Sequence, residues 1–205
     1  MTFAKDGEAQ ASHAAYLLHT GRVSNLEEAI RIAGGGGRVS RSRVQQHLAA
    51  MRQQDLGEED YNALRAGVLE VALECMDAIE QLLERFPERF PASLGTRLAG
   101  KAAAGRIEEL GVVHVRVLAT IKPAELADLL VGIGCDEPAF DLLQTSLGKL
   151  ERIRTRLRGV EVCLVVCPPE KTGSRGNTNL ITGMPVSIAT VDEVAQLLES
   201  IRGER

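Results

Sequence analysis

The segment from Phe90 to Ala119 constrains the fold more than any other part of this sequence. It begins as a short extended run and continues through a Gly-rich basic loop that contains Gly100 and Lys101. It ends in a stretch that alternates apolar and basic side chains: Val113, His114, Val115, Arg116 and Val117. Because successive side chains of a strand point to opposite faces, this pattern predicts a strand with one apolar and one basic face.

The region before this segment, from Glu58 to Phe86, predicts a long amphipathic helix. Apolar residues recur there at intervals of three and four, which places them on one side of a helix: Leu64, Val68, Val71, Cys75, Ile79, Leu82 and Phe86. Pro87 and Pro91 end the pattern, because proline lacks the amide that a helix interior needs. A helix of this length is typically a scaffold that packs across a sheet.

Several further elements are expected after the central segment. They are a helix at 124–133, a strand at 140–143, a hairpin of 150–158 with 160–167, a strand at 184–189 and a helix at 191–201. Pro123 suits the first position of its helix, and Arg158–Gly159 suits a tight turn. Thr190 and Glu193 have the capping-box spacing that begins a helix.

The first 55 residues predict short helices. Residues 1–10 are polar and expected to be loose, and helices are expected at 11–19, 25–33 and about 40–54. Ser24 and Glu27 have capping-box spacing before the second of these helices. Helices followed by mixed strands and helices are typical of an α+β fold. We therefore expect a helical subdomain, residues 1–55, and an α+β domain, residues 56–205, with a mixed or antiparallel sheet packed by helices.

Composition excludes several classes of protein. Hydrophobic residues make up 44% of the 205 residues, which is enough for an ordinary buried core. Aromatic residues make up only 3%, so base-stacking surfaces are not expected. The net charge of −4 argues against a globally basic nucleic-acid binder. No run approaches ~18 apolar residues and the N-terminus has no apolar signal segment, so we expect a cytoplasmic protein without a membrane span.

The four cysteines show no pattern of metal binding or catalysis. They are Cys75, Cys135, Cys163 and Cys167, and no two of them form a CxxC pair. Cys163 and Cys167 would lie about 13 Å apart along one strand, too far to share a zinc ion. No GxSxG motif occurs either. We expect buried, reduced thiols, no metal site and no cofactor.

The run from Gly95 to Ala102 nearly matches the phosphate-binding loop GxxxxGK[ST]. Lys101 occupies the lysine position, but Ala102 replaces the hydroxyl that binds magnesium. The preceding letters, FPASL, do not form the strongly apolar strand that such a loop follows. A working loop of this kind is therefore not expected.

The alternating strands predict a basic surface. If they share one sheet, His114 and Arg116 join the arginines of the second hairpin strand on one face: Arg152, Arg154, Arg156 and Arg158. Such a face suits the phosphate of a nucleotide or a nucleic-acid backbone. The candidate ligand-binding residues are Lys101, His114, Arg116, Arg152, Arg154 and Arg156. The alternative is an ordinary solvent face whose arginines pair with Glu108, Glu109, Glu151 or Glu161.

A second basic cluster lies at the third expected helix. Arg38, Arg41, Arg43 and Arg52 have no acidic neighbours in that span of sequence. Two short helices around a Gly-rich turn resemble a helix-turn-helix, which makes Arg38, Arg41 and Arg43 candidate nucleic-acid contacts. The alternative is a small helical cap with an exposed arginine face.

The layout from the long helix to Cys167 resembles the nucleotidyltransferase fold of the polymerase-β type. In that family a Gly-Ser or Gly-Gly pair precedes two aspartates on a strand, and a third carboxylate follows on a later strand. Here Gly100-Lys101 takes the first place, His114-Val115-Arg116 the second and Glu161 the third. The resemblance covers about half of the chain and rests on layout. Because imidazole and guanidinium cannot replace the oxygen ligands of magnesium, it implies a fold that has lost its transfer chemistry.

These features predict a non-catalytic interaction protein, similar in layout to bacterial proteins of unknown function. The expected partner is another protein, a second copy of the chain or a phosphate-bearing ligand such as a nucleotide. One alternative is a nucleic-acid-binding regulator that uses the helix from Arg38 to Arg52. Another is a small enzyme of unrecognised type with Glu161 as a general base.

Overall fold

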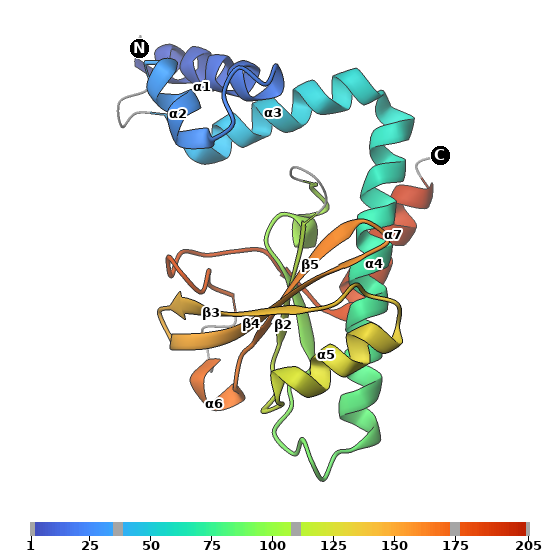
Figure 1. Cartoon of the computed structure of the whole chain (residues 1–205). Helices are drawn as coiled ribbons and strands as arrows, with labels where there is room; N and C mark the ends of the chain where they lie inside the picture. The colour runs from blue at the N-terminus through green and yellow to red at the C-terminus, as the bar shows by residue number, and fades with distance from the viewer. Residues whose placement is uncertain (1–2, 35–38, 108–111, 173–176, 204–205) are drawn as a thin grey trace. The chain divides into compact units, whose positions relative to one another are not determined.

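The computed structural model describes residues 3–34, 39–107, 112–172 and 177–203 (Figure 1). The chain divides into two compact units, residues 1–63 and 64–205. The sequence prediction put the boundary after residue 55, whereas the two units divide within the first turns of the long helix. None of the described helices is both long and apolar enough to cross a membrane.

The described part of the first unit contains three complete helices, α1 (Phe3–His19), α2 (Leu26–Ile32) and α3 (Arg41–Leu56). Small and aliphatic side chains form its core: Ala11, Ala14, Ala15, Leu17, Val23, Ala29, Val44 and Leu48. The expectation that residues 1–10 are loose is wrong, because α1 already begins at Phe3. The cap of α2 is Asn25 rather than Ser24, since the Asn25 side chain accepts a hydrogen bond from the Glu28 amide at 2.8 Å.

The long helix predicted at Glu58–Phe86 is confirmed as α4, Glu58–Arg85. Its apolar side supplies the largest contribution to the core of the second unit: Val68, Leu69, Val71, Ala72, Cys75, Met76, Ile79 and Leu83. Its opposite side is acidic and partly exposed, as the spacing of three and four predicts.

The second unit is an α+β fold around one six-stranded mixed sheet. The strands are β1 (Thr96–Ala99), β2 (Val112–Val117), β3 (Ala139–Thr145), β4 (Gly148–Leu157), β5 (Val160–Val166) and β6 (Ile188–Ala189). Their order in the sheet is β3-β4-β5-β2-β1-β6. Among the described strands, β2 and β5 run parallel to each other, and the other neighbouring pairs are antiparallel. The remaining elements are η1 (Ala102–Ala104), α5 (Pro123–Gly132), α6 (Pro169–Thr172) and α7 (Val191–Gly203).

One face of this sheet is covered by helices. The alternating valines of β2 lie there beside Val162, Leu164 and Val166 of β5. Helices α4, α5 and α7 contribute the facing side chains of the core, and Figure 1 shows these helices gathered along one side of the sheet. Burial of this apolar area is the main term that stabilises the unit.

The other face carries most of the charged strand residues, and we call it the open face. Its members follow from the strand registers: Arg97, His114, Arg116, Asp141, Arg152, Arg154, Arg156, Glu161 and Cys163. At one end it holds a small apolar cluster of Leu118, Leu150, Val165, Cys167 and Leu180. Leu180 belongs to the segment 177–186, which is fastened by the bridge between Thr178 and Pro185 and by the hydrogen bond from Ser146 N to Leu180 O.

The structure places two predicted segments within the sheet. The strand predicted at 160–167 is β5, which lies between β4 and β2. The run that nearly matches a phosphate-binding loop is largely strand, since Thr96–Ala99 form β1. Its first residue, Gly95, has a φ of +74°, and an added Cβ would lie 2.5 Å from Oε1 of Glu80. Glu80 fills that space because it accepts hydrogen bonds from the amide and hydroxyl of Thr96 at 2.6 and 2.8 Å.

Candidate functional site

The strand registers bring most of the predicted anion-binding residues together on the open face. His114 of β2 lies opposite Cys163 of β5, which in turn lies opposite Arg154 of β4. Two residues further along β2, Arg116 lies opposite Val165, and Val165 lies opposite Arg152. Because residues that face each other across paired strands share a face of the sheet, basic side chains stand on both sides of the small residues of β5.

Arg152 and Arg154 share one carboxylate. Arg152 donates two hydrogen bonds to Asp141, from Nε to Oδ1 at 2.7 Å and from Nη2 to Oδ2 at 2.6 Å. Arg154 Nε lies 3.4 Å from the same Oδ2. The hydrogen bond from Arg152 lowers the pKa of Asp141, so this group stays ionised. The single negative charge of Asp141 is shared by two guanidiniums, so the group of Arg152, Arg154 and Asp141 keeps a net positive charge.

Arg156 is exposed at the far end of β4. Its Cα partner across the sheet is Glu161, whose carboxylate accepts the weak hydrogen bond of Cys163 at 3.6 Å. Among the described residues, no side chain forms an ion pair with Arg156. Arg154 and Arg156 are the two exposed arginines of the open face, and they lie about 7 Å apart along β4.

Arg116 has a structural partner. It is only 5% exposed and donates a hydrogen bond from Nη2 to the carbonyl of Thr178 at 2.7 Å. Burial lowers the pKa of this guanidinium, although not enough to remove its charge at neutral pH. Arg116 therefore fastens segment 177–186 over the small apolar cluster.

His114 lies on the open face of β2, an inner strand of the sheet between β5 and β1. Although the residue is exposed, its ring is partly enclosed by protein on the sheet side, and this burial lowers the pKa of His114. The positive charges of Arg152 and Arg116 lower this pKa further, while Glu161 opposes them. His114 is consequently neutral at pH 7 in the unliganded protein and presents both a donor and an acceptor nitrogen.

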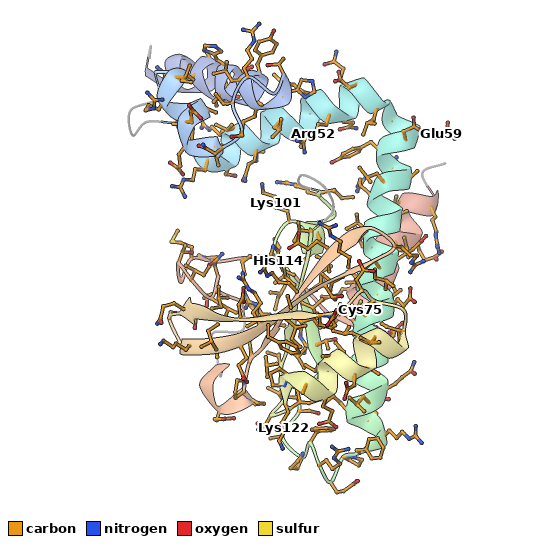
Figure 2. All side chains as sticks on the ribbon, viewed as in Figure 1. Arg52, Glu59, Cys75, Lys101, His114 and Lys122 are labelled. Atoms are coloured by element: carbon orange, nitrogen blue, oxygen red, sulfur yellow. The ribbon has the colours of Figure 1, made fainter. Side chains whose placement is uncertain are left out.

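Lys101 follows Gly100, whose backbone lies close to the ring of His114. Gly100 precedes Lys101, and a Cβ added to Gly100 would lie 4.0 Å from Cδ2 of His114. Figure 2 shows Lys101 and His114 near the end of the sheet where β1 leads into η1. The Gly-rich turn that the sequence placed in this region therefore adjoins the open face.

Cys163 does not have the properties of a catalytic nucleophile. It is 4% exposed, and burial together with the neighbouring Glu161 raises its pKa to about 11. The thiol therefore stays protonated at neutral pH and is a poor nucleophile. Among the described residues, no three His, Cys, Asp or Glu side chains are grouped so that they could hold a metal ion.

Arg158 lies away from the open face, which corrects the expectation that it joins the basic surface. It occupies the tight turn between β4 and β5 with a φ of 50° and pairs with Glu74 of α4. It lines a shallow groove of about 580 Å³ together with Leu73, Asp77 and Leu198. Arg202 also lines this groove and pairs with Glu70 at 2.8 Å. The two arginines therefore tie α7 and the β4–β5 turn to α4.

The basic cluster of the first unit is paired with acids. Arg41 Nη2 lies 2.5 Å from Glu27 Oε1, and Arg43 Nη1 lies 3.4 Å from Glu8 Oε2. The acids come from α1 and α2, so the sequence neighbours of these arginines did not reveal them. Arg38, the third residue of this predicted cluster, lies outside the described residues.

Two residues of the open face were missed by sequence reasoning. Asp141 was not considered because the expected strand 140–143 gave no sign of its partner, which depends on the register of β3 with β4. Arg97 belongs to the run that nearly matches a phosphate-binding loop, whereas the structure places it on β1 opposite Arg116. Four residues, TRLA, are too short a run for alternation to predict this strand from the sequence.

Comparisons with protein-family models, with curated proteins and with solved structures each found no match to this chain. The chemistry of the open face is therefore the basis for a functional assignment.

Proposed function

We propose that this protein is a non-catalytic interaction protein whose second unit binds a phosphate-bearing ligand on the open face of its sheet. The observation that carries the proposal is the placement of His114, Arg154 and Arg156 on that face. All three are exposed, and they come from two strands that flank the buried Cys163. A site on paired strands is held more firmly than one on loops.

The geometry suits a tetrahedral anion. His114 and Arg154 lie two strands apart, which is about 10 Å between backbones, and Arg154 and Arg156 are about 7 Å apart. Long guanidinium side chains converge across such distances, and each offers a planar pair of donors to phosphate oxygens. A neutral imidazole adds one further hydrogen bond. The scarcity of aromatic residues favours recognition of phosphate over recognition of a stacked base.

The absence of catalysis in this proposal rests on residue types. At the two positions where the nucleotidyltransferase resemblance places metal-binding aspartates, the chain has His114 and Arg116. Glu161 is the one acid left at the three compared positions, and a single carboxylate does not hold two magnesium ions. The proposal therefore assigns binding to this face and no transfer reaction.

The other two functions stay predictions. Nucleic-acid binding through Arg38, Arg41 and Arg43 would have to displace Glu27 and Glu8 from Arg41 and Arg43. An enzymatic role for Glu161 would require a substrate within hydrogen-bond reach of its carboxylate. No contact among the described residues favours either function.

Titration of the full chain with sulfate, phosphate and a panel of nucleotides, followed by calorimetry, tests the proposal. We expect the double variant R154A/R156A to weaken anion binding by roughly tenfold or more, since two charge-assisted hydrogen-bond donors are removed. The matched control is R89A/R202A, which removes the same charge at two half-exposed arginines paired with Glu125 and Glu70. We expect the control to stay within about twofold of the unmodified chain.

Two results would contradict the proposal. One is the absence of any anion binding at millimolar concentration. The other is an equal loss of binding in R154A/R156A and in R89A/R202A, which would show that only the net charge matters. Magnesium-dependent transfer of nucleotidyl groups by the purified chain would overturn the non-catalytic part.

A further inference from the structure

Strand β3 is an edge of the sheet with an exposed apolar surface. Within the described part of the chain it pairs only with β4, through an unbroken register from Ala139↔Arg154 to Thr145↔Gly148. Phe140 is 56% exposed and Leu142 is 63% exposed. Both lie on the opposite side of the sheet from Asp141, which faces the open face.

The usual protections of an edge strand are missing from β3. Proteins commonly blunt such edges with charged residues, proline or a β-bulge. The sequence of β3, AFDLLQT, contains no proline, and its register with β4 contains no bulge. Its one charged residue, Asp141, is held by Arg152 and Arg154 of the same chain. An unprotected edge of seven residues is a template for pairing with another strand.

The hairpin geometry shows which backbone groups point outward. Thr145 and Gly148 flank a two-residue turn and therefore direct their amide and carbonyl groups toward each other. Because hydrogen-bonded and non-hydrogen-bonded pairs alternate along an antiparallel ladder, the outward-directed groups of β3 belong to Phe140, Leu142 and Gln144. These outward groups are evenly spaced about Leu142, the central residue of the strand.

We propose that β3 pairs in antiparallel fashion with β3 of a second copy of this chain, about a two-fold axis through Leu142. In this register all seven residues are paired, Leu142 lies opposite the partner's Leu142, and Phe140 lies opposite the partner's Gln144. The outward amide and carbonyl groups of the two strands then satisfy each other. The inference depends on β3 alone and is independent of the proposed anion binding.

Charge repulsion and the number of paired residues favour this register over the two registers next to it. A shift that centres the axis on Asp141 places this carboxylate directly opposite the partner's Asp141, and like charges in that position are destabilising. A shift in the other direction, to Leu143, leaves Ala139 and Phe140 unpaired. The register centred on Leu142 places Asp141 opposite the partner's Leu143 and leaves each carboxylate with its own Arg152.

In such a dimer, corresponding faces of the two sheets would lie on the same side. A two-fold axis perpendicular to the sheet keeps the open faces of both copies on one side and the helix-covered faces on the other. On the covered side, Phe140, Leu142 and the same residues of the partner would form one apolar strip across the junction. A self-complementary strand explains why large apolar side chains are tolerated at this edge.

Sedimentation velocity of the full chain, from about 1 to about 500 μM, tests the inference. We expect twice the mass of one chain at high concentration. The variant Leu142→Lys places two ammonium groups opposite each other at the axis, so we expect it to raise the dimer dissociation constant by roughly tenfold or more. The matched control is Ile181→Lys, which adds the same charge at a residue that is 61% exposed in another segment. We expect the control to stay within about twofold.

Amide exchange in the same samples reports the structure of the contact. We expect the amides of Phe140, Leu142 and Gln144 to become protected as the chain concentration rises, and this protection to be lost in Leu142→Lys. Circular dichroism melting of both variants checks that each is folded. A monomer at every concentration would overturn the inference. A dimer unaffected by Leu142→Lys, or one whose β3 amides gain no protection, would also overturn it.

Discussion

The two faces of the sheet are made from the same strands but are specified by different physical requirements. On β4, Ile153 and Leu157 point into the helix-covered core, while Arg154 and Arg156 point to the open face. The covered face is fixed by close packing against α4, α5 and α7. On the open face, the described apolar packing is the small cluster around Leu180 at one end, where Arg116 fastens segment 177–186. Most of the described core packing therefore lies on the covered face.

The two sides of the sheet also differ in how far their arginines are paired with carboxylates. Arg158 and Arg202, which lie on the side of the helices, each pair with a carboxylate of α4. On the open face Arg152 and Arg154 share Asp141, and the described residues include no ion-pair partner of Arg156. The positive charge of the open face is therefore incompletely neutralised. Such an excess of charge costs folding energy and is expected where an anion binds.

Adjacent substitutions on β4 should give the largest contrast between the faces. Ile153→Ala removes a fully buried side chain and leaves a cavity in the core, so we expect a loss of about 2–5 kcal/mol in the free energy of unfolding. Arg154→Ala, one residue away on the open face, should change this free energy by no more than about 0.5 kcal/mol. Chemical denaturation measures both values.

The same two variants should show the opposite order in anion binding. Folded Ile153→Ala is expected to bind sulfate as the unmodified chain does, whereas Arg154→Ala is expected to bind it more weakly. If Arg154→Ala destabilised the chain as strongly as Ile153→Ala, the open face would be a structural surface and the contrast between the faces would fail.

Much of the fold was predictable because its strongest signals are local. The alternating valines of β2 and the helix α4 follow from periodicity within one segment. The turn at Arg158–Gly159 follows from the residue types of that pair. The capping box is confirmed as well, since Thr190 N donates to Glu193 at 2.7 Å and Glu193 N donates to Thr190 Oγ1 at 3.3 Å.

The order of the strands was not predictable in this way. The central position of β5 and the pairing of Arg152 with Asp141 depend on which strands become neighbours, and a single sequence carries little information on that choice. For the same reason, alternation predicted the shared face of His114 and Arg154 only on the condition that the strands form one sheet. The burial of Arg116 under Thr178 comes from a segment 62 residues away and has no local signal.

Thiol chemistry offers a second contrast, because Cys163 lies on the open face but is buried there. Burial raises its pKa from the ordinary 9.0 to about 11, so the native chain at pH 8 should hold about a hundredfold less thiolate at this position than an unperturbed thiol. We expect alkylation of Cys163 by neutral iodoacetamide to be slower by at least that factor in the native chain than in the unfolded chain. Peptide mass spectrometry of both states measures the ratio.

The unfolded chain is also the control in that experiment, since Cys163 should react there at the rate of an ordinary thiol. Cys167, whose pKa burial also raises to about 11, should behave in the same way. Rapid alkylation of native Cys163 would mean that this part of the open face opens readily. The rigid platform required by the proposed anion site would then be lost.

The smallest expected effect is a proton linked to anion binding at His114. Burial lowers the pKa of His114 in the free protein, and Arg152 and Arg116 add to that shift. A bound anion would place negative charge beside the imidazole, beyond that of Glu161, and would raise this pKa. Binding should therefore take up a proton, and affinity should increase as the pH falls from about 8 to about 5.5. Sulfate is the suitable probe because its own charge is constant over that range.

Calorimetry in buffers of different ionisation enthalpy measures the proton uptake directly. We expect His114→Gln to abolish this uptake while the charged neighbours of the ring, Glu161, Arg152 and Arg116, stay in place. The matched control is His47→Gln, since His47 belongs to the first unit, where it hydrogen-bonds Glu8 at 2.8 Å, and we expect this variant to keep the proton uptake. If His114→Gln bound sulfate with an unchanged pH dependence, the anion would bind elsewhere on the strand face. In that case the arginines would bind the anion without His114, and the imidazole would have no part in recognition.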